Sequence, residues 1–240
     1  MTIDTTSWTL VDLVRRQAEA YGELEFMSFE HGTRLTFASL DRDSDTLARN
    51  LATLGVVPGD RVMAVLKNRI EFMLAMVAVQ KLGAVFVPIN TELKGAFLQH
   101  QLRNSEPRVL FLDCDLYDAF DNVEGDNETL TTTIYVAGDV PDARPAFLKA
   151  AAAMTFEEVV AIDGADDGVL VKPRPQDIAF IMYTSGTTGP AKGTVHFHRD
   201  VMAICDCFPR SMLRPTADDI FCGSPPLAFT FGLGGLALFP

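Results

Sequence analysis

The chain has 240 residues, of which 48% are hydrophobic and 22% are charged, and this ordinary globular composition argues against a disordered protein. Its 20 lysines and arginines against 32 aspartates and glutamates give a net charge of −12, which repels the phosphates of nucleic acids and of anionic membranes. We therefore predict neither a nucleic acid nor a membrane surface as a partner. A phosphate-bearing ligand would have to be held locally, by backbone N–H groups and a few cations.

The sequence also predicts where the protein works. Residues 1–20 contain no basic region followed by a long apolar stretch, so no secretory signal is apparent. The apolar run at 72–79 is too short to cross a bilayer. Both features predict a soluble, cytoplasmic protein, in which the four cysteines are expected to be reduced thiols.

Helix and strand patterns alternate through the first part of the chain. Helices are predicted at 10–20, 38–54, 68–82 and 93–104, and strands at 24–29, 34–37, 61–66, 84–88 and 108–112. In the third helix, Asn68 is expected to cap the free N–H groups, with Glu71 three residues on, and Gly83 to end the helix. The crossover from 61–66 to 84–88 must be right-handed, which makes these two strands parallel. The predicted fold is α/β, with largely parallel sheets flanked by helices.

The pattern is weaker further along the chain. Only one strand, at 134–136, is predicted within 115–142, and 147–160 is predicted to be helical. Residues 163–176 are rich in Asp, Gly and Pro, which is typical of a boundary between domains. The predicted organisation is a first α/β subdomain at 1–162, a linker at 163–176 and the start of a second subdomain at 177–240.

A strand predicted at 177–183 runs directly into the loop TSGTTGPAKG at 184–193. Glycines let several N–H groups converge on an anion, hydroxyls add donors, and Lys192 adds a positive charge. The loop is not a Walker A loop, because Lys192 lies between Ala191 and Gly193 instead of between a glycine and a Ser or Thr. Composition alone would favour a passive hairpin loop, so the case for a phosphate site depends on the full string.

The string YTSGTTGPAKG resembles the phosphate-loop signature of the adenylate-forming superfamily, which includes acyl-CoA synthetases, luciferases and peptide-synthetase adenylation domains. The usual signature is Thr-Ser-Gly-Thr-Thr-Gly-x-Pro-Lys-Gly. Only Ala191 departs from it, standing where the family has Pro, which reduces loop rigidity without removing a donor or the lysine. Residues 35–90 look like the family's front subdomain, and 174–189 match its approach to the loop. The resemblance implies the front part of the large N-terminal domain of an adenylate-forming enzyme.

This resemblance also implies an activity. An AMP-forming acyl- or aryl-CoA ligase makes acyl-AMP and pyrophosphate from a carboxylate and ATP, and then transfers the acyl group to CoA as co-substrate. The loop would hold the β- and γ-phosphates, with Mg²⁺ bridging phosphate oxygens. The residues expected to bind the ATP phosphates are Thr184, Ser185, Gly186, Thr187, Thr188, Gly189 and Lys192. No catalytic residue and no metal-ligating residue is assigned.

The segment SPPLAFTFGLGGLALFP at 224–240 bears on the substrate. Many family members read Pro-Leu-x-His-x-x-Gly here, with an aromatic or His side chain beside the acyl pocket; Phe229 stands at the His position and Gly232 at the Gly. The run Phe-Thr-Phe-Gly-Leu-Gly is similar to that of benzoate and 2-aminobenzoate CoA ligases. We therefore expect an aromatic acid, with Phe229, Phe231 and Gly232 at the acyl pocket. Alternatively, the two phenylalanines lie on one face of a core strand.

Two pairs of residues could suggest a metal site or catalytic bases. His196 and His198, like Cys205 and Cys207, are spaced i, i+2, which places both members on one face only in a strand. Because no C-x-x-C is present, packing or loop roles are favoured over zinc. Residues that flank this loop in the family pack or cap the next helix, so the histidines are left out of the catalytic set.

Two alternatives to a CoA ligase stay open: an adenylation domain that loads a carrier protein, and a truncated, non-catalytic nucleotide-binding or interaction protein. The second has support because the family's adenosine-binding segment, ribose-contacting acid, hinge and C-terminal lysine would all follow residue 240. For the same reason, the 240-residue chain alone is expected to be inactive. The apolar segment 233–239 is expected to form a helix without packing partners, and hence a homo-oligomer.

Overall fold

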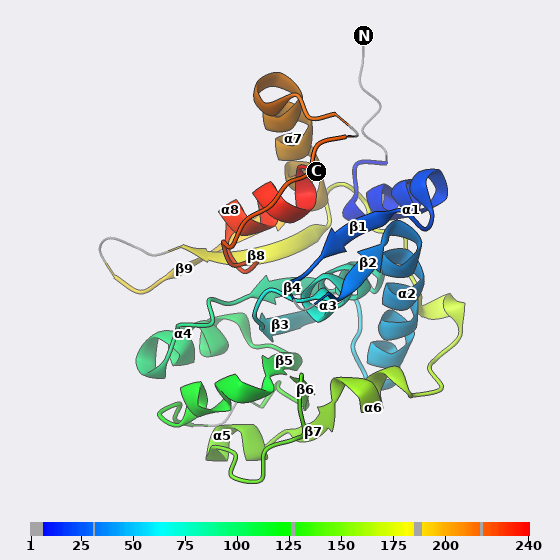
Figure 1. The fold of residues 1–240 in the computed structure, drawn as a ribbon. Helices are drawn as coiled ribbons and strands as arrows, with labels where there is room; N and C mark the ends of the chain where they lie inside the picture. The colour runs from blue at the N-terminus through cyan, green and yellow to red at the C-terminus, as the bar shows by residue number, and fades with distance from the viewer. Residues whose placement is uncertain (1–6, 31, 126–127, 185–188, 217) are drawn as a thin grey trace.

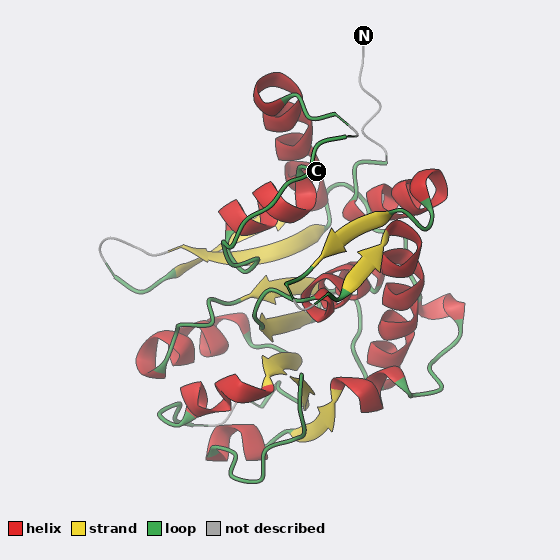
Figure 2. Cartoon of the chain, viewed as in Figure 1, coloured by secondary structure: helices red, strands yellow, loops and turns green. Residues whose placement is uncertain are grey.

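The computed structural model describes residues 7–30, 32–125, 128–184, 189–216 and 218–240. Within them, one large sheet has the strand order β7-β6-β5-β3-β4-β8-β9, and β1 and β2 form a separate antiparallel hairpin (Figure 1). Neighbouring strands of the large sheet are parallel, except that β8 and β9 are antiparallel. Helices lie on both sides of this sheet (Figure 2). The predicted α/β class with a largely parallel sheet is confirmed.

The strands are β1 (Glu25–Ser28), β2 (Arg34–Thr36), β3 (Arg61–Val65), β4 (Val85–Pro88), β5 (Val109–Asp113), β6 (Thr132–Val136), β7 (Ala152–Thr155), β8 (Ile178–Thr184) and β9 (Lys192–Phe197). The α-helices are α1 (Leu10–Tyr21), α2 (Phe37–Thr53), α3 (Ile70–Lys81), α4 (Gly95–Ser105), α5 (Ala146–Lys149), α6 (Phe156–Val160), α7 (His198–Phe208) and α8 (Thr230–Leu233). The 3₁₀-helices are η1 (Cys114–Phe120) and η2 (Asp167–Val169), and the π-helices are η3 (Pro209–Leu213) and η4 (Gly234–Leu238).

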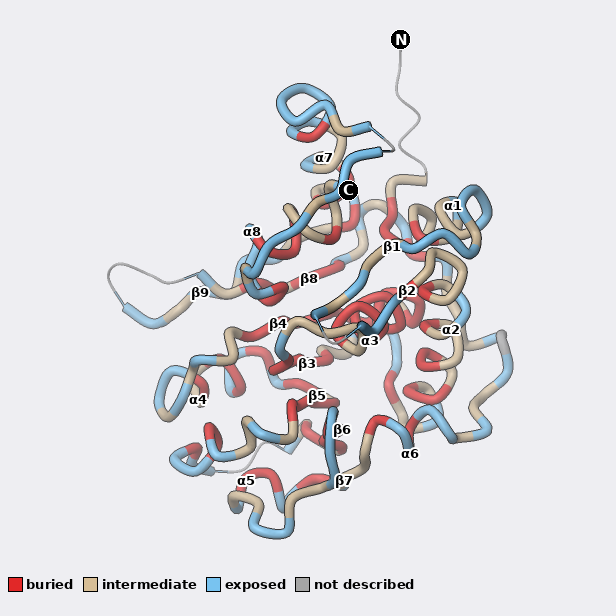
Figure 3. Tube along the Cα trace, in the orientation of Figure 1, coloured by how far each residue is buried: buried red, intermediate tan, exposed pale blue. Residues whose placement is uncertain are grey.

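The central strands β3, β4 and β5 are apolar along most of their length because both of their faces are covered. In β3, Val62 and Ala64 belong to the buried cluster on the side of α2 and α3, whereas Met63 and Val65 belong to the cluster on the side of α4. This is the alternation that a strand imposes, and a strand buried on both faces therefore reads as a continuous apolar run. Helix α3 is buried along most of its length, as its apolar sequence predicted (Figure 3). Among the helices that the structure describes, none combines the length and apolarity that a membrane span requires.

Two local predictions are wrong. Helix α3 begins after Arg69 without a side-chain cap, and the Asn68 amide instead contacts the backbone at Pro225 and Leu227. The helix predicted at 147–160 is interrupted by β7, which pairs in parallel with β6 along the edge of the sheet. Helix α6 then begins at Phe156, after the N-cap residue Thr155, whose hydroxyl accepts from the Glu158 N–H. Pairing with β6 supplies the hydrogen bonds that make this alanine-rich segment a strand.

The segment predicted as a linker, 163–176, passes the end of α3, where the Val171 N–H donates to the Lys81 carbonyl at 2.8 Å. Strand β8 follows it and pairs with β4, so the large sheet includes strands from before and after the segment. The division into subdomains at 163–176 stays a prediction.

Candidate phosphate-binding site

The predicted phosphate loop joins β8 to β9. Thr184 ends β8, Lys192 begins β9, and the two residues are paired across this antiparallel hairpin. Because β8 runs parallel to β4, Thr184 lies at the carboxyl edge of the parallel strands (Figure 1). Ligands of open α/β sheets bind outside this edge. The first and last residues of the predicted phosphate-binding set, Thr184 and Lys192, are therefore brought together at the sheet edge where ligands of such folds bind.

The middle of the predicted set, Ser185, Gly186, Thr187 and Thr188, lies outside the described residues. Gly189 comes next. Its φ of 132° is a backbone conformation that glycine adopts readily, because glycine has no Cβ. The side chains of Thr184 and Lys192 are exposed, so both are accessible to an anion. The roles of these residues in ATP binding stay predictions.

Helix α4 supports both strands of the hairpin. The Tyr183 hydroxyl lies 2.7 Å from Oδ1 of Asn104 and 3.3 Å from the Gln101 carbonyl. Directly before the other strand, Nε2 of His100 lies 2.8 Å from the carbonyl of Ala191, the residue that precedes β9. Burial raises the pKa of the Tyr183 phenol, which keeps its proton available for donation. Sequence reasoning missed these contacts; the i, i+4 spacing of His100 and Asn104 on a helix was the available signal.

Packing explains the glycine after the lysine. A Cβ on Gly193 would lie 2.9 Å from Cγ2 of Ile181 and 3.5 Å from Cε1 of Tyr183. The first distance is shorter than carbon atoms tolerate, so a side chain here would displace Ile181 or β9. Gly193 thus permits the close approach of the two strands that brings Lys192 opposite Thr184.

The aromatic segment after residue 224 is not a strand. Phe229 is the N-cap residue of α8 and Phe231 lies in α8, with 42% and 76% of their surfaces exposed. The alternative that both are core residues of one strand is therefore wrong. Gly232 is buried, and a Cβ on it would lie 2.1 Å from the Pro226 carbonyl oxygen. That the three residues line an acyl pocket stays a prediction.

The sequence pattern of the AMP-binding enzyme family matches residues 14–240. The chain belongs to the AMP-binding enzyme family. A benzoate–CoA ligase of Thauera aromatica is 30% identical over 188 residues, which are 78% of this chain and 33% of that protein. A long-chain-fatty-acid–CoA ligase of Mycobacterium tuberculosis is 34% identical over 169 residues, which are 70% of this chain and 30% of that protein.

The fold comparison agrees with this family. The solved structure of an anthranilate CoA ligase in complex with anthranoyl-AMP matches with a TM-score of 0.80 and 24% identity, over 97% of this chain and 43% of that chain. A benzoate CoA ligase from Burkholderia xenovorans matches with a TM-score of 0.79 and 22% identity, over 97% of this chain and 43% of that chain. These likenesses establish the fold. The chain spans about a third of the length of the curated relatives named above.

In this AMP-binding enzyme chain, helix α7 contains His198, Cys205 and Cys207. His198 is buried at the start of α7, where its Nδ1 accepts from the Leu10 N–H at 3.2 Å. Burial lowers the pKa of this imidazole to about 4. Cys205 and Cys207 lie on the helix α7, where i, i+2 positions diverge. No group of three or more His, Cys, Asp or Glu side chains suited to a metal occurs in the described part of the chain.

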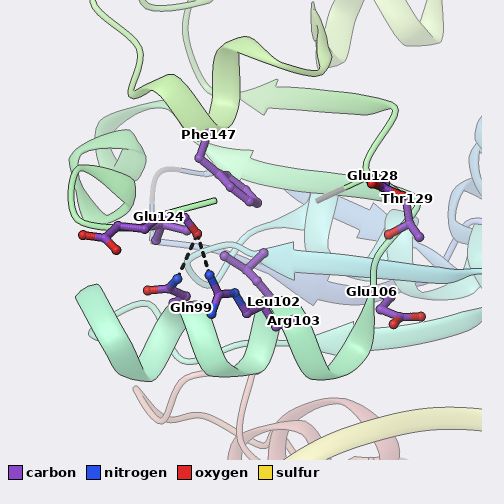
Figure 4. Close-up of a pocket in the computed structure, with 9 residues that line it drawn as sticks. Gln99, Leu102, Arg103, Glu106, Glu124, Glu128, Thr129 and Phe147 are labelled. Atoms are coloured by element: carbon purple, nitrogen blue, oxygen red, sulfur yellow. Dashed lines mark hydrogen bonds between the residues drawn. The ribbon is translucent and has the colours of Figure 1, made fainter. Parts of the chain in front are cut away.

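A cavity of about 360 Å³ lies between α4 and the segment that follows η1 (Figure 4). Gln99 and Arg103 donate to the Glu124 carbonyl at its wall, at 2.8 and 3.1 Å. Leu102 and Phe147 provide its apolar surface. None of the predicted site residues lines this cavity. That the phosphate site lies at the β8–β9 hairpin stays a prediction.

Proposed function

We propose that this chain supplies the phosphate-binding part of an AMP-forming acyl- or aryl-CoA ligase. In such an enzyme the carboxylate attacks the α-phosphorus of ATP and pyrophosphate leaves; the thiol of CoA then attacks the acyl carbon and AMP leaves. The observation that carries the proposal is the pairing of Thr184 with Lys192 at the carboxyl edge of the sheet. This pairing holds the two ends of a glycine- and hydroxyl-rich loop together beside a lysine.

The proposed task of the loop is to bind the β- and γ-phosphates as negative charge develops on the leaving pyrophosphate. The Lys192 ammonium supplies positive charge, and the Thr184 hydroxyl and loop N–H groups supply donors. The tethers from His100 and Asn104 of α4 to the hairpin support this role, because donors that are already positioned need no reorganisation during the reaction.

Mg²⁺ is compatible with these residues. It prefers oxygen ligands, retains several waters and is commonly bound through substrate phosphates. The chain would need to supply only an oxygen such as the Thr184 hydroxyl, which is exposed at the base of the loop. A bound Mg²⁺ would supply further positive charge to the phosphates.

We further propose an aromatic acid as the substrate. Phe229 and Phe231 are exposed on α8, where they can offer flat apolar surface to a ring. Relatives named for aromatic acids, the benzoate–CoA ligase and a 4-chlorobenzoate–CoA ligase of an Arthrobacter species, support this choice. The fatty-acid relative of comparable similarity makes a substrate screen necessary.

Binding of Mg²⁺-pyrophosphate to the 240-residue chain, measured by calorimetry, tests the loop. Because this chain spans about a third of its curated relatives, we expect no turnover from it alone, so binding is the proper measurement. Lys192→Ala should weaken binding by about tenfold or more, as the loss of a charge-assisted contact implies, without lowering the melting temperature. Lys172→Ala, which removes another exposed lysine, is the matched control. Equal affinities of parent and Lys192→Ala would refute the assignment.

The substrate class is tested with the enzyme encoded by the complete reading frame that contains this chain. CoA-thioester formation from benzoates is compared with that from straight-chain fatty acids. We expect the benzoates to have the higher kcat/KM. A clear preference for long alkyl acids would exclude the aromatic substrate while leaving the ligase proposal intact.

A further inference from the structure

Asn68 is a polar residue that the proposed reaction does not use. It follows β3 at the carboxyl edge of the sheet, and both ends of its amide bond to a segment 157 residues further along the chain. Its Nδ2 donates to the Pro225 carbonyl at 2.9 Å, and its Oδ1 accepts from the Leu227 N–H at 2.7 Å. Because one end of the amide only donates and the other only accepts, these two bonds determine its orientation.

The backbone that Asn68 holds is in direct contact with the first turn of α8. The Pro226 carbonyl accepts from the Phe229 N–H at 3.1 Å. From the other side, Gly232 packs so closely that a Cβ would lie 2.1 Å from the Pro226 oxygen and 2.9 Å from the Pro225 oxygen. A shift of the turn at 225–226 would therefore move the start of α8 with it.

Apolar packing anchors the end of this turn but not the rings of Phe229 and Phe231. Leu227 and Leu233 are buried in the same cluster as Phe180 of β8, but Phe229 and Phe231 point outward and have no such packing. The directions of these two rings thus depend on the backbone that carries them. Without the Asn68 amide, the Pro225 carbonyl and the Leu227 N–H would lose their hydrogen-bond partner in a partly buried place.

We propose that Asn68 is a positioning residue of the acyl pocket. Its amide fixes the turn at 225–227, and the contact of this turn with Gly232 then fixes the direction of Phe229 and Phe231. This inference rests on the proposed function. Asn68 is therefore expected to affect the binding of the carboxylic acid and not the binding of the ATP phosphates, because the phosphate loop is tied to α4 by separate contacts.

Three variants separate the two hydrogen bonds. Asn68→Ala removes both, Asn68→Asp keeps an acceptor for Leu227 but places a carboxylate oxygen against the Pro225 carbonyl, and Asn68→Gln keeps both groups at a longer reach. Asn90→Ala is the matched control, because Asn90 follows the neighbouring strand β4 and, within the described part of the chain, its side chain bonds only to the Glu92 N–H.

The first measurement is amide hydrogen exchange on the 240-residue chain. Asn68→Ala should speed exchange at Leu227 and Leu233 by about tenfold, since local opening no longer has to break the two bonds. Exchange at Tyr183 and the affinity for Mg²⁺-pyrophosphate should stay unchanged. Unchanged exchange at Leu227 and Leu233 would overturn the inference. If Asn68→Ala does not fold, Asn68→Gln should give a smaller change of the same kind.

The second measurement is kinetic and uses the enzyme encoded by the complete reading frame. In Asn68→Ala the KM for the acid should rise by about tenfold while the KM for ATP stays unchanged, a split that a general loss of structure would not produce. Equal rises in both KM values, or no change in the acid KM, would overturn the positioning role alone. If the parent forms no thioester with any acid, the proposed function fails and the positioning role fails with it.

Discussion

Nε2 of His100 lies 2.8 Å from the carbonyl oxygen of Ala191, the residue immediately before Lys192. A carbonyl can only accept, so Nε2 must carry the proton of this hydrogen bond. One helical turn further on, Asn104 contacts the Tyr183 hydroxyl on the opposite strand. One face of α4 thus ties down both strands of the hairpin and positions the ends of the phosphate loop.

We predict that His100→Ala weakens the binding of Mg²⁺-pyrophosphate to the 240-residue chain by about fivefold, because one hydrogen bond contributes about 1 kcal/mol. His100→Gln is the matched control, since its amide N–H can donate to the same Ala191 carbonyl. Calorimetry of the three proteins decides the matter. Affinity in His100→Ala equal to that of the parent would show that the tether does not position the loop.

The parts of the fold that could be predicted from the sequence have local causes. The apolar runs around 61–66 and 84–88, separated by an apolar helix, allow only a parallel pair buried on both faces. The loop at 184–193 is recognisable because its glycines, hydroxyls and lysine are contiguous. Both kinds of signal lie within one stretch of chain.

The parts that could not be predicted depend on contacts between distant segments. Asn68 has the residue type and position of a helix cap, but its amide instead bonds to the distant backbone at Pro225 and Leu227. Residues 152–155 form the strand β7 because they pair with β6, whereas their alanines do not favour a strand. His100 reaches Ala191 only after α4 has docked on the sheet. The i, i+4 spacing of His100 and Asn104 places both on one face of α4, but no local pattern encodes which distant segments these residues contact.

Lys81 is fully buried between α2 and α3, where its Nζ lies 2.6 Å from Oδ1 of Asp41 and 2.5 Å from Oδ1 of Asp45. We predict that Lys81→Met lowers the free energy of unfolding by about 3 to 5 kcal/mol, because it leaves the carboxylates without their cation. Lys149→Met, at an exposed lysine, should change it by less than about 0.5 kcal/mol. Urea unfolding provides the comparison, and a Lys81→Met protein as stable as the parent would contradict the prediction.

His198 should make stability depend on pH. Burial lowers its pKa from 6.5 to about 4, although Asp177 and Asp12 oppose the shift, and protonation would also remove the Nδ1 lone pair that accepts from Leu10. Between these values the unfolded chain binds a proton that the folded chain does not. The contribution of His198 to the free energy of unfolding is therefore fully present above pH 6.5 and is lost as the pH falls toward 4.

In His198→Asn, the side-chain oxygen can accept from the Leu10 N–H without titrating. Lowering the pH from 7 to 5 should cost the parent roughly 2 kcal/mol more stability than it costs this variant. Urea unfolding of both proteins at the two pH values measures the difference. An equal pH dependence in parent and variant would exclude His198 as its source.

The surface through which we predict self-association differs from the one the sequence suggested. In the segment 233–239, Leu233 and Ala237 are buried, and Leu236 packs against the same core, so this helix has partners within the described residues. A group of exposed apolar side chains lies instead on α7 and η3, where 50% of the surface of Ile204 and 72% of the surface of Met212 are exposed. Phe208 and Leu213 extend this surface.

We predict that the 240-residue chain associates through this α7–η3 surface, because a contiguous exposed apolar face favours contact with another copy. Replacing Ile204 and Met212 together by Glu places charge in the contact and should shift the chain to a monomer in sedimentation velocity. Val57→Glu is the matched control, since Val57 is also more than half exposed but lies in the turn before β3. A parent chain that stays monomeric at high concentration would refute self-association, and a double variant that still associates would place the contact elsewhere.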